Sequence, residues 1–195
     1  MIISIGGKAG SGKTTIAKML AEKLGWPLYF IGKIRRAKAA ELNMTLEEYN
    51  KYGETHAETD LEVDEYQKQL GLTEDNFVIE GRTSFYFIPH SIKIFFEVDD
   101  LAGATRAYGE QQQNSERRKE SRAQTIEEVL TKIKERNAND AARYKKYYDL
   151  DFLNHGKYDL VVDTSELTTE QVFDRVWRYI NQKQTEIDPV KPDSN

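Results

Sequence analysis

The chain has no cysteine among its 195 residues, so disulfides and thiol chemistry are excluded. It has only three histidines, and His56, His90 and His155 are too widely spaced to suggest a metal-ligand cluster. No apolar run approaches the length that crosses a bilayer, and the N-terminus has no basic-then-apolar leader. We therefore expect a cytoplasmic protein with no membrane partner.

Basic charge is also limited, with 28 Lys and Arg against 33 Asp and Glu, which gives a net charge of −5. Without a basic excess, the electrostatic footprint of nucleic-acid binding is missing, and we expect no nucleic-acid partner. The length suits one domain, which we place at 1–186, and we expect a monomer. Two of the four prolines lie near the C-terminus, where 187–195 is expected to form a flexible tail.

The most informative motif is Gly7-Lys-Ala-Gly-Ser-Gly-Lys-Thr14, which fits the phosphate-binding loop G-x-x-x-x-G-K-[ST]. An apolar strand pattern precedes it and an amphipathic helix pattern follows, as the phosphate-binding mechanism requires. Lys13 would reach the outer phosphates, and the Thr14 hydroxyl would bind Mg²⁺. The predicted nucleotide-binding residues are Gly7, Ala9, Gly10, Ser11, Gly12, Lys13, Thr14 and Thr15.

Strand and helix patterns alternate along the rest of the chain, which predicts an α/β fold with a parallel sheet. Apolar segments predict strands at 2–5, 28–31, 77–80, 92–98 and 158–162. Capping boxes predict helix starts at Thr45, Thr59, Thr125 and Thr168. Gly32 is expected to end the second strand, and Gly71 the helix that starts at Thr59.

Two segments stand outside this alternation, a helical insert at about 32–71 and a polar stretch with its following helix start at about 109–136. A core with one insert on each side of the loop suggests two mobile flaps that close over two substrates. Closure would exclude water from a phosphoryl group in transfer. We predict an acceptor-binding insert and a lid.

Phosphoryl transfer depends on cations placed around the moving group. Arg82 follows the third predicted strand, at the sheet edge where α/β proteins bind ligands, and is expected to meet an acceptor phosphate. Glu80 could hold Mg²⁺ through water or orient the acceptor. The alternative for both residues is a solvated surface turn.

Further arginines lie in the insert and in the long helix after Thr125. Arg36 could grip a phosphate as a bidentate fork, with Arg35 a weaker candidate; a solvated helix face is the alternative. Arg136, Asp140 and Arg143 are spaced to share one helix face, so Asp140 could hold both arginines toward the phosphates. The alternative is a set of exposed ion pairs.

Two other signals are weaker. The basic cluster at 117–122 is interpreted as a mobile charged stretch, with a role on ATP left open. Asp100-Leu-Ala-Gly103 matches a GTPase D-x-x-G motif, but an aspartate at a strand–helix junction is usually an N-cap. The chain also lacks the Asn-Lys-x-Asp pattern that recognises guanine.

With these residues identified, the chain resembles the short, archaeal-type branch of the cytidylate kinases, within the nucleoside monophosphate kinases. The segments that carry the resemblance are 2–15, 32–36, 44–49, the acidic helix with Asp60, Glu62 and Asp64, 78–82, 135–148 and 158–165. The most specific among them are Arg-x-x-x-Asp-x-x-Arg-Tyr and Tyr-Asp-Leu-Val-Val-Asp-Thr-Ser. Lys8 and Arg35 depart from the family's usual residues, and Thr83 stands where the longer bacterial cytidylate kinases have Asp.

The resemblance implies a three-layer P-loop fold with five parallel strands, and the reaction of ATP with CMP to give ADP and CDP, with Mg²⁺. Carried over by position, Arg36 and Arg82 hold the acceptor phosphate. Arg136 and Arg143 bridge to the transferring group. Asp163 and Ser165 lie near the adenine edge.

We therefore predict a kinase that transfers the γ-phosphoryl group of ATP to a nucleoside monophosphate, CMP or dCMP being favoured. Lys13, Arg82, Arg136 and Arg143 are the predicted catalytic residues, and Arg36, Glu80, Arg82 and Asp140 the predicted acceptor-binding residues. Two alternatives remain, a P-loop kinase for another small acceptor and a nucleotide-binding switch or ATPase that acts on a protein.

Overall fold

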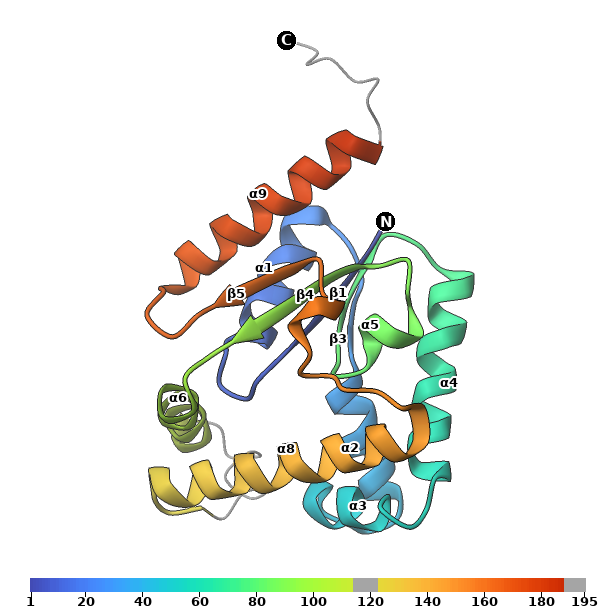
Figure 1. The fold of residues 1–195 in the computed structure, drawn as a ribbon, viewed down its shortest axis with the longest axis vertical. Coiled ribbons are helices and arrows are strands. Elements are labelled where there is room, and N and C mark those ends of the chain that lie inside the picture. The colour runs from blue at the N-terminus through green and yellow to red at the C-terminus, as the bar shows by residue number, and fades with distance from the viewer. Residues whose placement is uncertain (114–122, 188–195) are drawn as a thin grey trace.

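The computed structural model describes residues 1–113 and 123–187 (Figure 1). The strands are β1 (Ile2–Gly7), β2 (Leu28–Phe30), β3 (Phe77–Glu80), β4 (Ile92–Glu97) and β5 (Leu160–Asp163). The helices are α1 (Lys13–Leu24), α2 (Ile31–Glu41), α3 (Leu46–Tyr52), α4 (Glu58–Thr73), α5 (Ser84–Phe87), α6 (Asp100–Gln113), α8 (Ile126–Tyr148), η1 (His155–Lys157) and α9 (Thr169–Ile187). Within this part of the chain, no helix combines the length and apolar character needed to cross a membrane.

The five strands form one parallel sheet in the order β2-β3-β1-β4-β5, which confirms the predicted α/β fold. The central strand β1 lies between β3 and β4, with Ile5 paired to Glu80 on one side and to Ile94 on the other. Because β1 is central, the loop that follows it emerges in the middle of the carboxyl edge, where α/β folds bind ligands.

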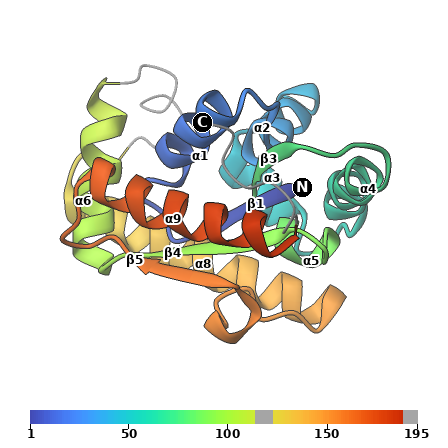
Figure 2. The same cartoon turned by 90° about the horizontal axis from the view of Figure 1, so that it is seen from above.

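The side chains of the strands alternate between two buried faces. On one face, Ile3 and Ile5 pack with residues of α1 and α9. On the other, Ile2, Phe77 and Ile79 pack with residues of α2 and α4. Both faces are buried because helices cover each of them, as a parallel sheet requires. The result is a three-layer arrangement, and Figure 2 shows α1 and α9 side by side over the sheet.

The long helix α8 crosses the carboxyl edge of the sheet. In Figures 1 and 2, α6 and α4 lie on opposite sides of the molecule, and in Figure 1 α8 runs between them below the strand ends. Its N-terminal half contacts α6, and its Lys132 Nζ lies 3.4 Å from Glu47 Oε2 of α3. One face of α8 is therefore directed at the same edge as the loop after β1.

Several predicted boundaries were wrong. The helix expected to start at Thr59 begins at Glu58, and Thr59 is buried inside it, where its hydroxyl donates to the His56 carbonyl. Gly32 lies within the first turn of α2 rather than ending β2. Gly71 lies inside α4, where a Cβ atom would come within 2.9 Å of Ile88, so close packing explains this glycine.

Other boundaries were confirmed. Capping boxes open α3 at Thr45 and α9 at Thr168, and the hydroxyl of Thr125 caps α8. Of the predicted tail, Ile187 belongs to α9 and 188–195 lie outside the described residues. The central part of the predicted lid, 114–122, also lies outside them.

Candidate active site

The loop between β1 and α1 has the backbone shape of a phosphate cradle. Gly7, Gly10 and Gly12 have φ values of 140°, 74° and 82°, a region that side chains other than glycine rarely adopt. At Gly10, a Cβ atom would also lie 2.0 Å from the carbonyl oxygen of Gly103 in α6. Gly12 is the N-cap of α1, so the free N–H groups and positive dipole end of that helix face this loop.

The residues that follow the cradle connect it to strand β3. Thr14 Oγ1 donates a hydrogen bond of 2.9 Å to Glu80 Oε2, at the end of that strand. Lys13 Nζ donates to the carbonyl of Lys8, within the loop itself. A hydroxyl beside a carboxylate is the oxygen-donor pair that suits Mg²⁺, which takes few protein ligands and completes its shell with water and phosphate. These residues therefore fit the predicted metal.

Lys8 connects the loop to the end of β4 and to the start of α6. Its Nζ atom lies 2.6 Å from Glu97 Oε1 and 3.2 Å from Asp100 Oδ1. Partial burial works against its charge, but these carboxylates outweigh it and raise the pKa of Lys8. Asp99 caps α6 by accepting from the N–H groups of the next helical residues, which confirms that a capping aspartate lies at this junction.

The end of β5, which pairs with β4, and the turn that follows it carry the two residues predicted near adenine. Asp163 Oδ1 accepts hydrogen bonds from the Ser165 hydroxyl (2.6 Å) and N–H (2.9 Å), and these bonds lower the pKa of Asp163. Arg106 of α6 donates to the carbonyls of Thr164 (2.9 Å) and Ser165 (2.8 Å). No sequence pattern singled out Arg106, because its partners come from a segment 58 residues away.

The three predicted catalytic arginines converge on one buried carboxylate. Asp140 Oδ2 lies 3.3 Å from Arg82 Nη1 and 3.7 Å from Arg136 Nε. Asp140 Oδ1 accepts a 2.7 Å hydrogen bond from Arg143 Nη2. Arg82 also donates to Asn137 Oδ1 at 2.9 Å, a contact that the sequence analysis did not anticipate. Residues four and three apart on α8 thus share a face, as the spacing predicted, and that face meets the end of β3.

A second buried carboxylate extends the cluster into the insert. Asp60 of α4 pairs with Arg143, whose Nε atom lies 2.5 Å from Asp60 Oδ2, and with Arg35 of α2. Arg35 also donates to Asn50 at 3.1 Å. Arg35 is therefore buried, so the alternative of a solvated helix face is wrong for this residue, while a role on a phosphate stays a prediction.

The charges of this cluster do not balance. Arg35, Arg82, Arg136 and Arg143 meet two carboxylates, so four positive and two negative charges leave an excess of two positive charges. Desolvation opposes the charge of Asp140, but the arginines around it lower its pKa. Although 42% of its side chain is exposed, Arg136 is closely surrounded by protein atoms; this loss of solvent and the charge of Arg82 lower its pKa to about 10, so Arg136 stays protonated near neutral pH.

The remaining predicted residues differ in their surroundings. Arg36 is half-buried on α2, and its positive charge adds to the effect on the pKa of Arg136. Arg143 has a side chain only 1% exposed, which leaves Arg82 (14%) and Arg136 (42%) as the open members of the set. Thr15 is exposed on the first turn of α1. The basic cluster at 117–122 lies outside the described residues.

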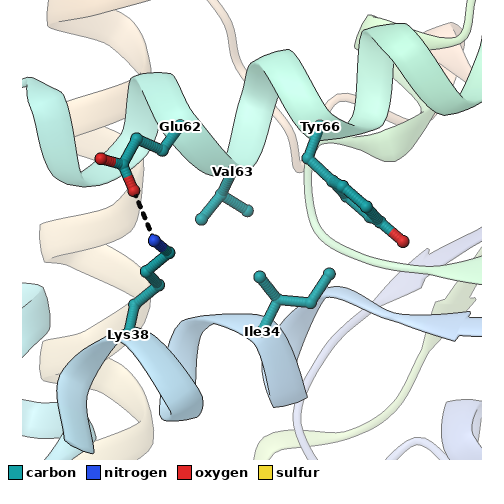
Figure 3. A pocket seen from close by; sticks show the side chains of 5 residues that line it. All are labelled: Ile34, Lys38, Glu62, Val63 and Tyr66. Carbon is teal, nitrogen blue, oxygen red and sulfur yellow. Dashed lines mark ion pairs between the residues drawn. The ribbon is translucent and has the colours of Figure 1, made fainter. Parts of the chain in front are cut away.

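A separate groove lies between α2 and α4 (Figure 3). Its walls are mainly apolar, with one ion pair of 2.8 Å between Lys38 Nζ and Glu62 Oε2. None of the predicted site residues lines it.

Comparison with known proteins agrees with this geometry. Residues 2–166 match the model of the cytidylate kinase-like family. The chain is 32% identical over 189 residues to a cytidylate kinase of Archaeoglobus fulgidus, covering 96% of this chain and 99% of the relative. It is 38% identical over 183 residues to a cytidylate kinase of Methanocaldococcus jannaschii, covering 90% and 95%.

Solved structures share the fold at low identity. An uncharacterized protein from Eubacterium ventriosum superposes with a TM-score of 0.68 at 19% identity, covering 93% of this chain and 98% of that one. A shikimate kinase from Bacteroides thetaiotaomicron superposes with a TM-score of 0.62 at 18% identity, covering 94% and 98%. These likenesses show the P-loop kinase fold. The family match and the archaeal relatives show more, and this chain belongs to the cytidylate kinase-like family.

Proposed function

We propose that the protein transfers the γ-phosphoryl group of ATP to a nucleoside monophosphate, CMP or dCMP, in the presence of Mg²⁺. One observation carries the proposal: the cradle and the arginine cluster are joined through the end of β3. Glu80 contacts Thr14 of the cradle, and Arg82, two residues further, contacts Asp140 of the cluster. A donor phosphate and an acceptor phosphate bound at these two places would lie next to each other.

Each part has a distinct role in this proposal. The loop N–H groups and Lys13 hold the ATP phosphates, while Thr14 and Glu80 hold the metal, directly or through water. When bound, Mg²⁺ would neutralise charge on the phosphate oxygens. Arg82 and Arg136 offer open guanidinium groups to the acceptor phosphate and to the transferring group, where positive charge stabilises the transition state most.

Arg36 is assigned to the acceptor phosphate, and Asp140 to holding the arginines in place. Arg143 is buried between two carboxylates, which favours a role in positioning other side chains over direct contact with the transferring group in this conformation. Asp163 and Ser165 are assigned to the adenine side, where Arg106 fixes their turn.

The insert at 32–71 and the lid at 109–136 remain part of the proposal. The insert supplies Arg35 and Asp60 to the cluster, which supports an acceptor-side role. We also propose a cytoplasmic monomer that acts on free nucleotides, because the chain lacks cysteine and has no basic excess for nucleic acid.

The choice of acceptor rests on the archaeal relatives that are named cytidylate kinases. It is tested by ADP release with ATP, Mg²⁺ and a panel of CMP, dCMP, UMP, AMP, GMP and shikimate. We expect CMP or dCMP to raise turnover at least about 100-fold above the rate without acceptor, since a positioned acceptor replaces water.

Stimulation by shikimate, or by a purine monophosphate alone, would instead favour the alternative of a kinase for another small acceptor. Slow hydrolysis that no acceptor stimulates would favour the nucleotide-binding switch. Chelating Mg²⁺ with EDTA should abolish turnover. Unchanged rates in EDTA would contradict the assignment of Mg²⁺ to the site.

A further inference from the structure

Asp60, like its partner Arg35, is a member of the cluster that no reaction step above uses. It lies on α4, its side chain is 1% exposed, and each of its oxygens contacts a different arginine. One oxygen contacts Arg35 of α2, and the other contacts Arg143 of α8. Three helices therefore meet at this one carboxylate, two from the predicted insert and one that carries the predicted catalytic arginines.

The contacts of Arg143 extend the influence of Asp60 to the open arginines. Its guanidinium group is planar and rigid, so contacts on two edges fix its orientation. Asp60 holds the Nε edge at 2.5 Å, and Asp140 accepts from Nη2 at 2.7 Å. With Oδ1 of Asp140 engaged in this way, Oδ2 is directed to Arg82 and Arg136.

The cluster also has features that a purely structural ion-pair network would avoid. Burying charges costs solvation, and well-packed apolar residues often give equal or greater stability. Among the described residues, Arg143 Nη1 is buried without a hydrogen-bond partner, and Arg143 Nε and Asp60 Oδ2 form their ion pair without hydrogen-bond geometry, which adds to that cost. The excess of two positive charges suits a site that is completed only when a phosphate binds.

We propose that Asp60 is a positioning residue: through Arg143 and Asp140 it aims Arg82 and Arg136 at the phosphoryl group, and it thereby couples the insert to catalysis. This inference rests on the proposed function, because it concerns the same reaction. A misplacement of about 1 Å in a group that orients the reacting atoms costs on the order of 100-fold in rate. Loss of the Asp60 charge should therefore lower kcat while leaving ATP binding unchanged.

The test compares Asp60→Asn with the native chain in acceptor-stimulated ADP release. We expect kcat to fall about 100-fold and the KM for ATP to stay within about twofold, since the Asp60 carboxylate pairs with arginines of α2 and α8, outside the cradle. Glu62→Gln is the matched control: Glu62 lies two residues along α4, is 62% exposed, and pairs with Lys38 in the groove of Figure 3. Its kcat should equal the native value.

Asp60→Glu separates charge from position. It keeps the carboxylate but displaces it by one methylene, so kcat should be about tenfold below native and about tenfold above Asp60→Asn. If Asp60→Asn does not fold, the kcat of Asp60→Glu tests the proposal by itself. A native kcat in folded Asp60→Asn or Asp60→Glu would overturn the inference, as would an equal effect on kcat and ATP KM. If the native chain shows no acceptor-stimulated turnover, the proposed function fails instead.

Discussion

The phosphate cradle and the arginine cluster lie side by side at the carboxyl edge of the sheet, but they are built in different ways. The cradle comes from one continuous run, 7–14, between a strand and a helix. The cluster takes residues from α2, α4, the end of β3 and α8, which are separated by up to 108 positions from Arg35 to Arg143. A site made from one segment is set by local backbone geometry, whereas a site made from four depends on how the whole chain packs.

This difference predicts different responses to mutation. In the cradle, a substitution should affect chemistry with little effect on the rest of the molecule. In the cluster, chemistry and stability should be linked, because the same ion pairs position the arginines and hold the helices together.

The largest effect is expected in the cradle. Lys13→Ala removes the cation nearest the outer phosphates, and turnover should fall about 1,000-fold because transition-state charge loses its stabilisation. The thermal unfolding midpoint should stay close to native, since Lys13 is only half-buried and bonds to its own loop. Lys18→Ala, exposed on the same helix, is the control. A near-native rate for Lys13→Ala would remove the cradle from the reaction.

The next effect is expected at the junction of the two regions. Arg82→Ala should lower kcat about 100-fold, since one positioned donor to developing charge is lost. It should also lower stability by about 1 kcal/mol or more, because Asn137 and Asp140 lose a charged partner. Steady-state kinetics and urea unfolding measure both effects, with Arg175→Ala on the exposed face of α9 as control. Lost activity without any loss of stability would show that the two properties are not linked here.

The smallest effect concerns a carboxyl group at the border of the cluster. Burial raises the pKa of Asp64 from 3.8 to about 6, although a hydrogen bond from Tyr148 opposes the shift. A raised folded-state pKa means that the stabilising contribution is complete below pH 4 and is lost as the pH rises through 6. At 1.36 kcal/mol per pKa unit, the native chain should lose about 2 kcal/mol relative to Asp64→Asn between pH 4.5 and pH 8.

Urea unfolding of both proteins at pH 4.5 and pH 8 measures this difference. Asp174→Asn, exposed on α9, should show no such trend. If the gap in stability between native and Asp64→Asn does not change with pH, folding does not raise the pKa of Asp64.

Sequence patterns were most reliable where structure depends on near neighbours. The loop motif, the strand before it, the helix after it and three of the four predicted N-caps depend on residues a few positions apart, and each was confirmed. The box at Thr59 failed because tertiary packing buries that residue inside α4, where its hydroxyl has another partner. The prediction that Gly71 ends a helix was wrong for a similar reason, since close packing against Ile88 accounts for this glycine.

Contacts between charged residues were likewise predictable only where the residues are close in sequence. The spacing on α8 predicted that Arg136, Asp140 and Arg143 share a face, because helical geometry is local. It did not predict that Asp60 would bury Arg143 and Arg35, because those contacts join helices that are distant in sequence. Arg35 shows this most clearly, since an arginine pair on a polar helix usually faces solvent.

By itself, the sequence determined the phosphate cradle, the order of strands and helices along the chain, and the family to which it belongs. These features follow from short-range backbone geometry and from the periodicity of apolar side chains. The tertiary structure decided which charges meet: it brought two aspartates among four arginines and left two positive charges in excess. Electrostatic energy depends on distance in space, which the folded chain sets and the spacing along the sequence does not.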